Sequence, residues 1–251
     1  GPSEKEAARA LVLEAVTAGG FGPREVTIRV NGLETPWGEA DLAAAAEARP
    51  DAVVIPKVEG PEDLAAARAR LEAAGAGDVA LWAMMETPGG VLNAREIAGA
   101  PGLACLVMGT NDLVKELGAE HTEGRAEVAT ALGLCLLAAR ARGLAILDGV
   151  YNAFKDREGL ERVCREGRAM GFDGKTLIHP DQLEVTNRVF APSEAELELA
   201  RRQVAAFEET RAKGEAVAVV DGRIVENLHV ETAKALIAKA DAIAALEAAA
   251  G

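Results

Sequence analysis

Apolar, β-branched runs alternate with helical segments along most of this chain. Helical periodicity marks the segments between the runs, among them residues 4–16, 61–73, 126–142 and 157–170. The runs themselves cover residues 25–30, 52–56, 79–85, 103–108, 144–147 and 175–178. Such alternation is typical of βα units, which build a parallel sheet covered by helices. We therefore predict an α/β fold with six parallel strands.

A closed barrel of this kind has eight βα units, and only six are visible here. The chain could form an open doubly wound sheet, but six strands alone would leave two unpaired edges. We therefore favour a TIM (β/α)8 barrel whose first two strands are absent from this chain. Residues 1–192 form the predicted barrel. Residues 193–251 form an extension made of a helix (193–213), a hairpin (216–225) and a final helix (228–249). We expect this extension to contribute to subunit contacts and to an active-site lid.

Polar residues follow the predicted strands, at the edge where a barrel carries its active site. Glu86 and Asp112 each end an apolar run, and Gly89 and Gly90 come shortly after the first of them. Two carboxylates on neighbouring strand ends suit a Mg²⁺ ion that keeps positions open for a substrate, with Mn²⁺ as the substitute. The two glycines would let backbone amides approach a substrate carboxylate. The alternative is that each acid caps the helix after its strand.

Other strand-end residues allow two interpretations each. Arg29 could bind a carboxylate or stabilise an enolate oxygen, or it could pair with a strand-end acid. Lys57 could form a Schiff base, although an ion pair at the rim is the better interpretation. For His179 we favour a structural role over acid–base chemistry. Asp148 is as well suited to a turn as to substrate contact.

Charge and cysteine content narrow the class of protein. The net charge of -13 argues against nucleic acid and anionic membranes as partners. The three cysteines, Cys105, Cys135 and Cys164, lie in apolar settings and suit reduced core residues of a cytoplasmic protein. No signal peptide or membrane-length apolar run is visible.

Taken together, the strand ends resemble the citrate lyase β-subunit-like family of the HpcH/HpaI aldolase superfamily. The matching segments are Ile28-Arg29-Val30-Asn31, Ile55-Pro56-Lys57, Met85-Glu86-Thr87, Gly109-Thr110-Asn111-Asp112, Leu147-Asp148-Gly149-Val150-Tyr151, Gly171-Phe172-Asp173-Gly174-Lys175 and Ile178-His179-Pro180-Asp181-Gln182. The resemblance extends from Ser3 to the last helix.

This resemblance implies a Mg²⁺-dependent carbon–carbon lyase. Its substrate would be a 3-hydroxyacyl-CoA thioester (malyl-CoA, methylmalyl-CoA or citramalyl-CoA), cleaved to a small 2-oxo acid and acetyl- or propionyl-CoA. The alternatives are a malyl-CoA thioesterase, a citrate lyase beta subunit and, in another class, a catalytically idle scaffold subunit. The resemblance also implies a homotrimer or homohexamer.

Site roles follow from the same resemblance. Glu86 and Asp112 match the metal ligands, and Arg29 matches the arginine that stabilises the enolate. The implied substrate-binding residues are Arg29, Gly89, Gly90, Thr110, Asn111 and Asp112. Glu226 stands where many members have a catalytic aspartate that acts in a neighbour's site. Because Glu226 is one methylene longer, its match to that aspartate is incomplete.

Overall fold

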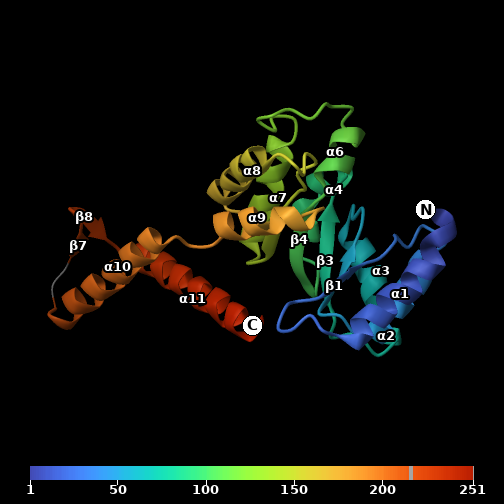
Figure 1. Cartoon of the computed structure of the whole chain (residues 1–251), viewed down its shortest axis with the longest axis horizontal. Coiled ribbons are helices and arrows are strands. Elements are labelled where there is room, and N and C mark those ends of the chain that lie inside the picture. The colour runs from blue at the N-terminus through green and yellow to red at the C-terminus, as the bar shows by residue number, and fades with distance from the viewer. Residues whose placement is uncertain (215–216, 251) are drawn as a thin grey trace. The chain divides into compact units, whose positions relative to one another are not determined.

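Six parallel strands form the central sheet of the chain (Figure 1). They are β1 (Thr27–Arg29), β2 (Ala52–Ile55), β3 (Ala80–Met85), β4 (Leu103–Met108), β5 (Ala145–Asp148) and β6 (Gly174–Lys175). Their spatial order is their chain order, and every neighbouring pair is parallel. The sheet curls into a half-barrel, so the predicted TIM-barrel-like α/β fold and its six visible strands are confirmed.

The structure is a computed structural model that describes residues 1–214 and 217–250. The chain divides into two compact units, Gly1–Thr186 and Asn187–Gly251. Helices connect the strands of the first unit, as the alternation predicted. They are α2 (Gly38–Ala48), α3 (Pro61–Ala73), α4 (Pro88–Leu92), α5 (Ala94–Ile97), α6 (Thr110–Glu116), α7 (Ala129–Ala141) and α8 (Arg157–Met170). The helices η1 (Pro2–Glu4) and α1 (Lys5–Ala18) precede β1, and η2 (Pro180–Gln182) and α9 (Leu183–Phe190) follow β6.

Side chains of β3 alternate between the two faces of the sheet. Leu81, Ala83 and Met85 are fully buried in the core. Trp82, Met84 and Glu86 are offset from them by one residue and line a cavity on the other face. This period of two places Glu86 on the inner face of the curled sheet, at the carboxyl end of its strand.

Strand β6 is shorter than predicted and lies earlier in the chain. The sequence predicts a strand over 175–178, whereas pairing ends at Lys175 apart from one further bond, from the Thr176 backbone N–H to the Asp148 carbonyl (3.0 Å). The N–H of Ile178 donates instead to the side-chain oxygen of Gln182 (2.9 Å). The chain therefore leaves the sheet here, because a side chain has replaced a strand as the hydrogen-bond partner.

The second unit contains α10 (Glu194–Ala212), β7 (Ala218–Val220), β8 (Arg223–Val225) and α11 (Asn227–Ala250). The strands form the predicted antiparallel hairpin, and Ala218, Val225 and Val230 make a small core. The first residue of the predicted hairpin, Ala216, lies outside the described residues. A capping box starts α10, with the Ser193 hydroxyl accepting from the Glu196 backbone N–H (3.3 Å).

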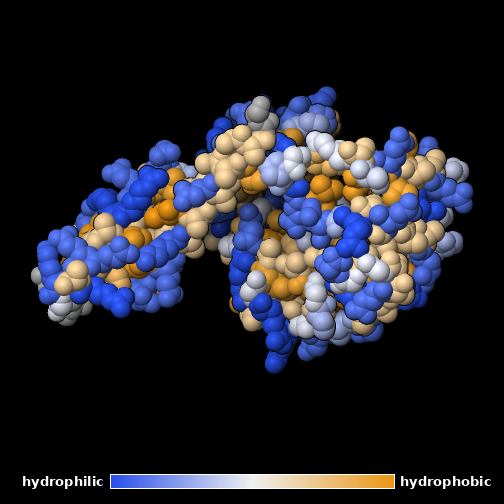
Figure 2. Space-filling view, turned by 90° about the horizontal axis from the view of Figure 1, so that it is seen from below, coloured by the Kyte–Doolittle hydropathy of each residue, from blue (hydrophilic) through white to orange (hydrophobic). Residues whose placement is uncertain are grey.

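No helix in the described part of the chain is long and apolar enough to cross a membrane. Hydrophilic side chains are mixed with apolar ones across the face shown in Figure 2. All three cysteines are free and buried, as predicted for core residues.

Candidate active site

A cavity of about 540 Å³ lies against the inner face of the curled sheet. Residues from β1, β2, β3 and β4, and from the loops after β4, β5 and β6, contribute to its wall. They are Thr27, Arg29, Val54, Trp82, Met84, Glu86, Val107, Met108, Gly109, Thr110, Asn111, Asp112, Val150, Thr176, Leu177 and Ile178. Of the predicted site residues, Arg29, Glu86, Thr110, Asn111 and Asp112 come together here.

Glu86 is a buried carboxylate at the end of β3, with 4% of its surface exposed. Its Oε1 accepts a hydrogen bond from the backbone N–H of Lys57 (2.8 Å). The pKa of Glu86 is raised to about 7, mainly by burial; the neighbouring Asp112 carboxyl contributes to the rise, and the hydrogen bond from the Lys57 N–H opposes it. A carboxylate held this way is poorly stabilised without a cation.

Neither acid caps a helix, which removes the alternative that the sequence left open. Thr87 caps α4 instead, since its hydroxyl accepts from the Gly90 N–H (3.0 Å). Asp112 lies inside the first turn of α6, whose N-cap is Gly109. Both carboxylates therefore remain available to a ligand in the cavity.

Gly109 allows Glu86 to lie close to the end of β4. A Cβ built on Gly109 would come within 2.4 Å of the Glu86 Cβ and 2.7 Å of its Oε2. Any larger residue would displace the carboxylate from its place beside Asp112. The Gly109-Thr110-Asn111-Asp112 segment thus needs its glycine for packing against the metal-ligand candidate.

The predicted role of Gly89 and Gly90 differs from their place in the structure. Neither residue lines the cavity. A Cβ on Gly90 would lie 2.2 Å from the carbonyl oxygen of Val58, and Gly89 lies beside the side chain of Glu59. Gly90 is thus required for close packing of α4 against the loop after β2. Substrate binding by these two glycines finds no support in this arrangement.

The donor set fits a magnesium ion. Two converging carboxylates supply the hard oxygen ligands that Mg²⁺ prefers, and Mg²⁺ usually takes only one or two carboxylates with water and substrate completing its shell. Within the described part of the chain, no group of three or more histidine, cysteine or acidic side chains could hold a metal. The site therefore suits a metal ion that is bound jointly by protein and substrate, and not one whose ligands all come from the protein.

We expect Mg²⁺ to bind this site more weakly as the pH falls below about 7, the pKa of Glu86. The folded chain holds a proton on Glu86 between pH 4.5 and about 7 that the unfolded chain has lost. Without metal, the contribution of Glu86 to the free energy of unfolding therefore falls as the pH rises through that window. Mg²⁺ must displace this proton, so its affinity should fall by up to about tenfold per pH unit below the pKa. Calorimetric titrations at several pH values measure this slope, and an affinity that does not change with pH would contradict it.

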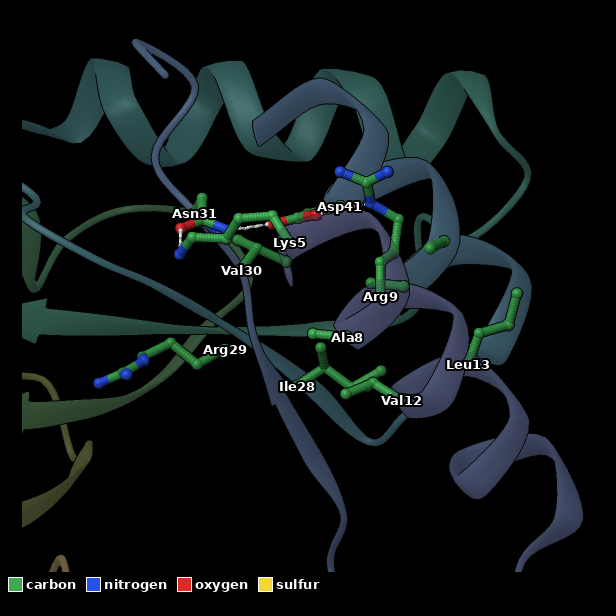
Figure 3. A pocket seen from close by; sticks show the side chains of 12 residues that line it. Lys5, Ala8, Arg9, Val12, Leu13, Ile28, Arg29, Val30, Asn31 and Asp41 are labelled. Atoms are coloured by element: carbon green, nitrogen blue, oxygen red, sulfur yellow. Dashed lines mark hydrogen bonds and ion pairs between the residues drawn. The ribbon is translucent and has the colours of Figure 1, made fainter. Parts of the chain in front are cut away.

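Arg29 extends from β1 away from α1 and from its neighbour Ile28 (Figure 3). The guanidinium is exposed and has no hydrogen-bond or ion-pair partner among the residues that the structure describes. The ion pair with a strand-end acid, one of the two sequence interpretations, is therefore absent from the described residues. An unpaired cation lining a cavity with two carboxylates is suited to an anionic substrate.

A polar network fixes the segment that follows Arg29 (Figure 3). Asn31 accepts from Lys5 Nζ (2.7 Å) and donates to Asp41 Oδ2, and Arg9 pairs with the other Asp41 oxygen (2.7 Å). Burial by itself raises the pKa of Asp41, but these hydrogen bonds outweigh it and hold the pKa below its usual value. The network ties β1 to α1 and α2, so Arg29 projects from an anchored strand.

Asn111 forms a reciprocal amide pair with Asn152 across the cavity rim. Asn111 Nδ2 donates to Asn152 Oδ1 (3.0 Å), and Asn152 Nδ2 donates to Asn111 Oδ1 (2.8 Å). Each amide keeps one N–H without a partner among the residues that the structure describes. The pair joins α6 to the loop after β5, and the sequence pattern did not single out Asn152.

Asp148 does not line the cavity and is fully buried. Arg125 Nη1 contacts both of its carboxylate oxygens (2.9 and 2.8 Å), and Lys175 Nζ contacts Oδ2 (3.0 Å). Burial lowers the pKa of Lys175, and Asp148 opposes that shift. This buried triad joins β5, β6 and the loop before α7, and it gives Asp148 a structural role.

The remaining predicted residues lie elsewhere. Lys57 is exposed and acts through its backbone N–H, which points at Glu86 because Lys57 adopts a left-handed conformation (φ 49°). His179 caps η2 by accepting from the Asp181 N–H (3.2 Å), which bears out the structural role. Glu226 lies in the second unit, between β8 and α11, where its backbone N–H donates to His229 Nδ1 (3.0 Å).

Comparison with known proteins identifies the family. The sequence matches the HpcH/HpaI aldolase/citrate lyase family over residues 1–180. The chain belongs to this family. The predicted resemblance is thereby confirmed, and the chain is also 31% identical to citrate lyase subunit beta of Escherichia coli over 95% of this chain and 81% of that protein.

Two further relatives inform the chemistry. A (3S)-malyl-CoA thioesterase of Cereibacter sphaeroides is 58% identical over 245 residues, covering 98% of this chain and 84% of that protein. The crystal structure of CitE from Mycobacterium tuberculosis, in complex with magnesium, acetoacetate and coenzyme A, matches with a TM-score of 0.76 at 28% identity. This structural match covers 96% of this chain and 86% of the CitE chain.

The lyase expectation is corrected by these relatives. The relative at 58% identity is named for thioester hydrolysis, whereas the citrate lyase subunits are much more distant, at 31–34% identity. The prediction of a carbon–carbon lyase as the main activity is therefore wrong. The thioesterase, one of the alternatives drawn from the sequence, agrees with the comparison.

Proposed function

We propose that this chain hydrolyses the thioester bond of a malyl-CoA-type 3-hydroxyacyl-CoA in a Mg²⁺-dependent reaction. The observation that carries the proposal is the cavity in which buried Glu86 lies beside Asp112, with the unpaired Arg29 on its wall. The 58% identity to a (3S)-malyl-CoA thioesterase supports hydrolysis as the reaction. Free CoA and a hydroxy diacid are the products.

Glu86 and Asp112 would hold the metal ion. When bound, Mg²⁺ supplies Lewis-acid polarisation of substrate oxygens. Attack by water on the thioester carbonyl places negative charge on the carbonyl oxygen before the carbon–sulfur bond breaks. Arg29 can neutralise this charge or hold the terminal carboxylate of the substrate. The anchored β1 strand keeps that guanidinium in place for either role.

Hydrolysis also needs a group that accepts a proton from water and returns one to the leaving thiolate. We propose Glu226 of a neighbouring copy of this chain for this role, as the family resemblance implies. Its carboxyl is exposed and has no hydrogen-bond partner among the described residues. A carboxylate is suited to such proton transfer when its pKa matches the working pH. Assembly as a homotrimer or homohexamer and a cytoplasmic location also stay predictions.

Product analysis tests the proposed reaction. The purified chain is incubated with malyl-CoA and Mg²⁺, free thiol is measured with a chromogenic disulfide, and any 2-oxo acid is trapped as a hydrazone. We expect free CoA and malate without glyoxylate, and no product when the metal is chelated or in Glu226→Gln. Glyoxylate together with acetyl-CoA would contradict hydrolysis. Neither product, in a chain shown to be folded, would support the idle scaffold.

A further inference from the structure

The side chain of Thr110 packs directly against the backbone of Gly149. A Cβ built on Gly149 would lie 2.3 Å from the Thr110 Oγ1, 2.6 Å from its Cγ2 and 3.0 Å from its Cβ. The φ of Gly149 lies outside the left-handed region, so this close contact, and not the backbone conformation, excludes a side chain here. Thr110 is buried and begins α6, the helix whose first turn carries Asp112. Any residue larger than glycine at 149 would therefore push the turn that carries this metal-ligand candidate.

Four hydrogen bonds hold the Gly149 backbone in place. Lys175 Nζ donates to the Gly149 carbonyl (2.5 Å), and the Gly149 N–H donates to Asp148 Oδ1 (2.8 Å). The preceding carbonyl, that of Asp148, accepts from both the backbone N–H (3.0 Å) and the hydroxyl (3.2 Å) of Thr176. Asp148 and Lys175 are themselves buried in the triad described above. Gly149 is thus fixed to the ends of β5 and β6.

Two further contacts hold the same turn of α6. Gly109, which precedes the turn, packs against Glu86, since a Cβ built on Gly109 would come within 2.4 Å of the Glu86 Cβ. The Asn111 amide exchanges two hydrogen bonds with Asn152 (3.0 and 2.8 Å). The turn is therefore held between the end of β3 on one side and the loop after β5 on the other.

Resting on the metal site of the proposed function, we propose that Gly149 is a positioning residue for that site. Its fixed backbone is a stop for Thr110, and this contact sets where Asp112 lies relative to Glu86. The buried triad thereby acts on the metal site without lining the cavity. Groups that orient metal ligands from outside the coordination shell change metal affinity by about 10- to 100-fold when they are replaced.

Binding of Mg²⁺ to the chain without substrate tests this role. We expect Gly149→Ala to raise the Kd of Mg²⁺, measured by calorimetric titration, about tenfold or more, because the added methyl group displaces Thr110. Gly133→Ala is the matched control and should keep the wild-type Kd, since a Cβ on Gly133 in α7 meets nothing within 4 Å. Circular dichroism at the titration temperature verifies that both variants are folded. A purely structural glycine would lower the unfolding temperature without changing the Kd of the folded chain.

A double-mutant cycle shows whether the effect passes through Thr110. Thr110→Ala removes Oγ1 and Cγ2, the two atoms closest to the built Cβ. In that background Gly149→Ala should raise the Kd by much less, whereas an equal increase in both backgrounds would overturn the proposed contact. If Gly149→Ala alone does not fold, a double variant that folds and binds Mg²⁺ supports the contact. A double variant that also fails to fold contradicts it.

The titration separates this role from hydrolysis of the thioester. A wild-type Kd in Gly149→Ala would overturn the positioning role even if the wild-type chain hydrolyses malyl-CoA. Weakened Mg²⁺ binding in Gly149→Ala, relieved in the double variant, would support the role. If the wild-type chain then hydrolyses no malyl-CoA, the proposed function is contradicted while the positioning role stands. A wild-type chain that binds no Mg²⁺ would overturn both.

Discussion

Glu86→Gln is expected to lower kcat/KM for malyl-CoA by about 10³-fold or more, because it removes a carboxylate that would hold the metal ion. Lewis-acid stabilisation is worth several kcal/mol, and each 1.4 kcal/mol is about tenfold in rate. Glutamine is nearly isosteric, and its oxygen can still accept from the Lys57 N–H. Thiol release measures the rate, and calorimetric titration should show Mg²⁺ affinity lost in the same variant.

The Glu86→Gln variant should lose activity without losing thermal stability. Burial raises the pKa of Glu86 to about 7, so at higher pH the wild-type chain carries an unfavourable buried charge when no metal is bound. Metal-free Glu86→Gln should therefore unfold at the same or a higher temperature than wild type at pH 8. Glu59→Gln alters an exposed acid outside the cavity lining and serves as the control. Wild-type Mg²⁺ dependence in Glu86→Gln would contradict the assignment of this ligand.

Asp148→Asn is expected to lower the free energy of unfolding by about 3–5 kcal/mol, the usual effect of breaking a buried ion pair. Asp148 is fully buried and compensates both Arg125 and Lys175. Without its charge, two cations remain in a site with little access to water. Urea unfolding followed by circular dichroism measures the loss, and replacing Lys175 by methionine in the same chain should recover part of it.

Asp78→Asn is the matched control for that experiment. Asp78 also pairs with an arginine through two contacts, from Arg49 Nη2 to each carboxylate oxygen (2.7 Å), but both side chains are half or more exposed. Exposed pairs contribute about 0–1 kcal/mol, so this substitution should change the free energy of unfolding little. If the two substitutions have equal effects, burial is not what makes the Asp148 triad important.

The lyase prediction failed for a chemical reason. Both cleavage of the carbon–carbon bond and hydrolysis of the thioester begin with an acyl-CoA at a metal site and an arginine that can stabilise an oxyanion. Glu86, Asp112 and Arg29 are therefore compatible with either reaction. The outcome depends on where a water molecule and a proton-transfer group sit relative to the thioester carbon, and strand-end motifs carry no information on that.

Short-range patterns explain the predictions that succeeded. Apolar, β-branched runs with polar residues at their ends placed the strands and put Glu86 and Asp112 at one edge of the sheet. The hairpin and the helix that begins near residue 193 were likewise predicted from local sequence. These features depend on residues a few positions apart, so they can be read from the chain alone.

Other features arise only when distant residues meet. The backbone N–H of Lys57 reaches Glu86 across 29 positions, and a left-handed lysine has no marker in the sequence. Asp148 forms buried ion pairs with Arg125 and Lys175, which lie 23 and 27 positions away, and so does not line the cavity. The burial that raises the pKa of Glu86 depends likewise on how the sheet curls. Local pattern thus determined the strands and which side chains end them. Tertiary packing decided which of these carboxylates is free to bind a ligand, because desolvation and ion pairing are set by neighbours that lie far away in the chain.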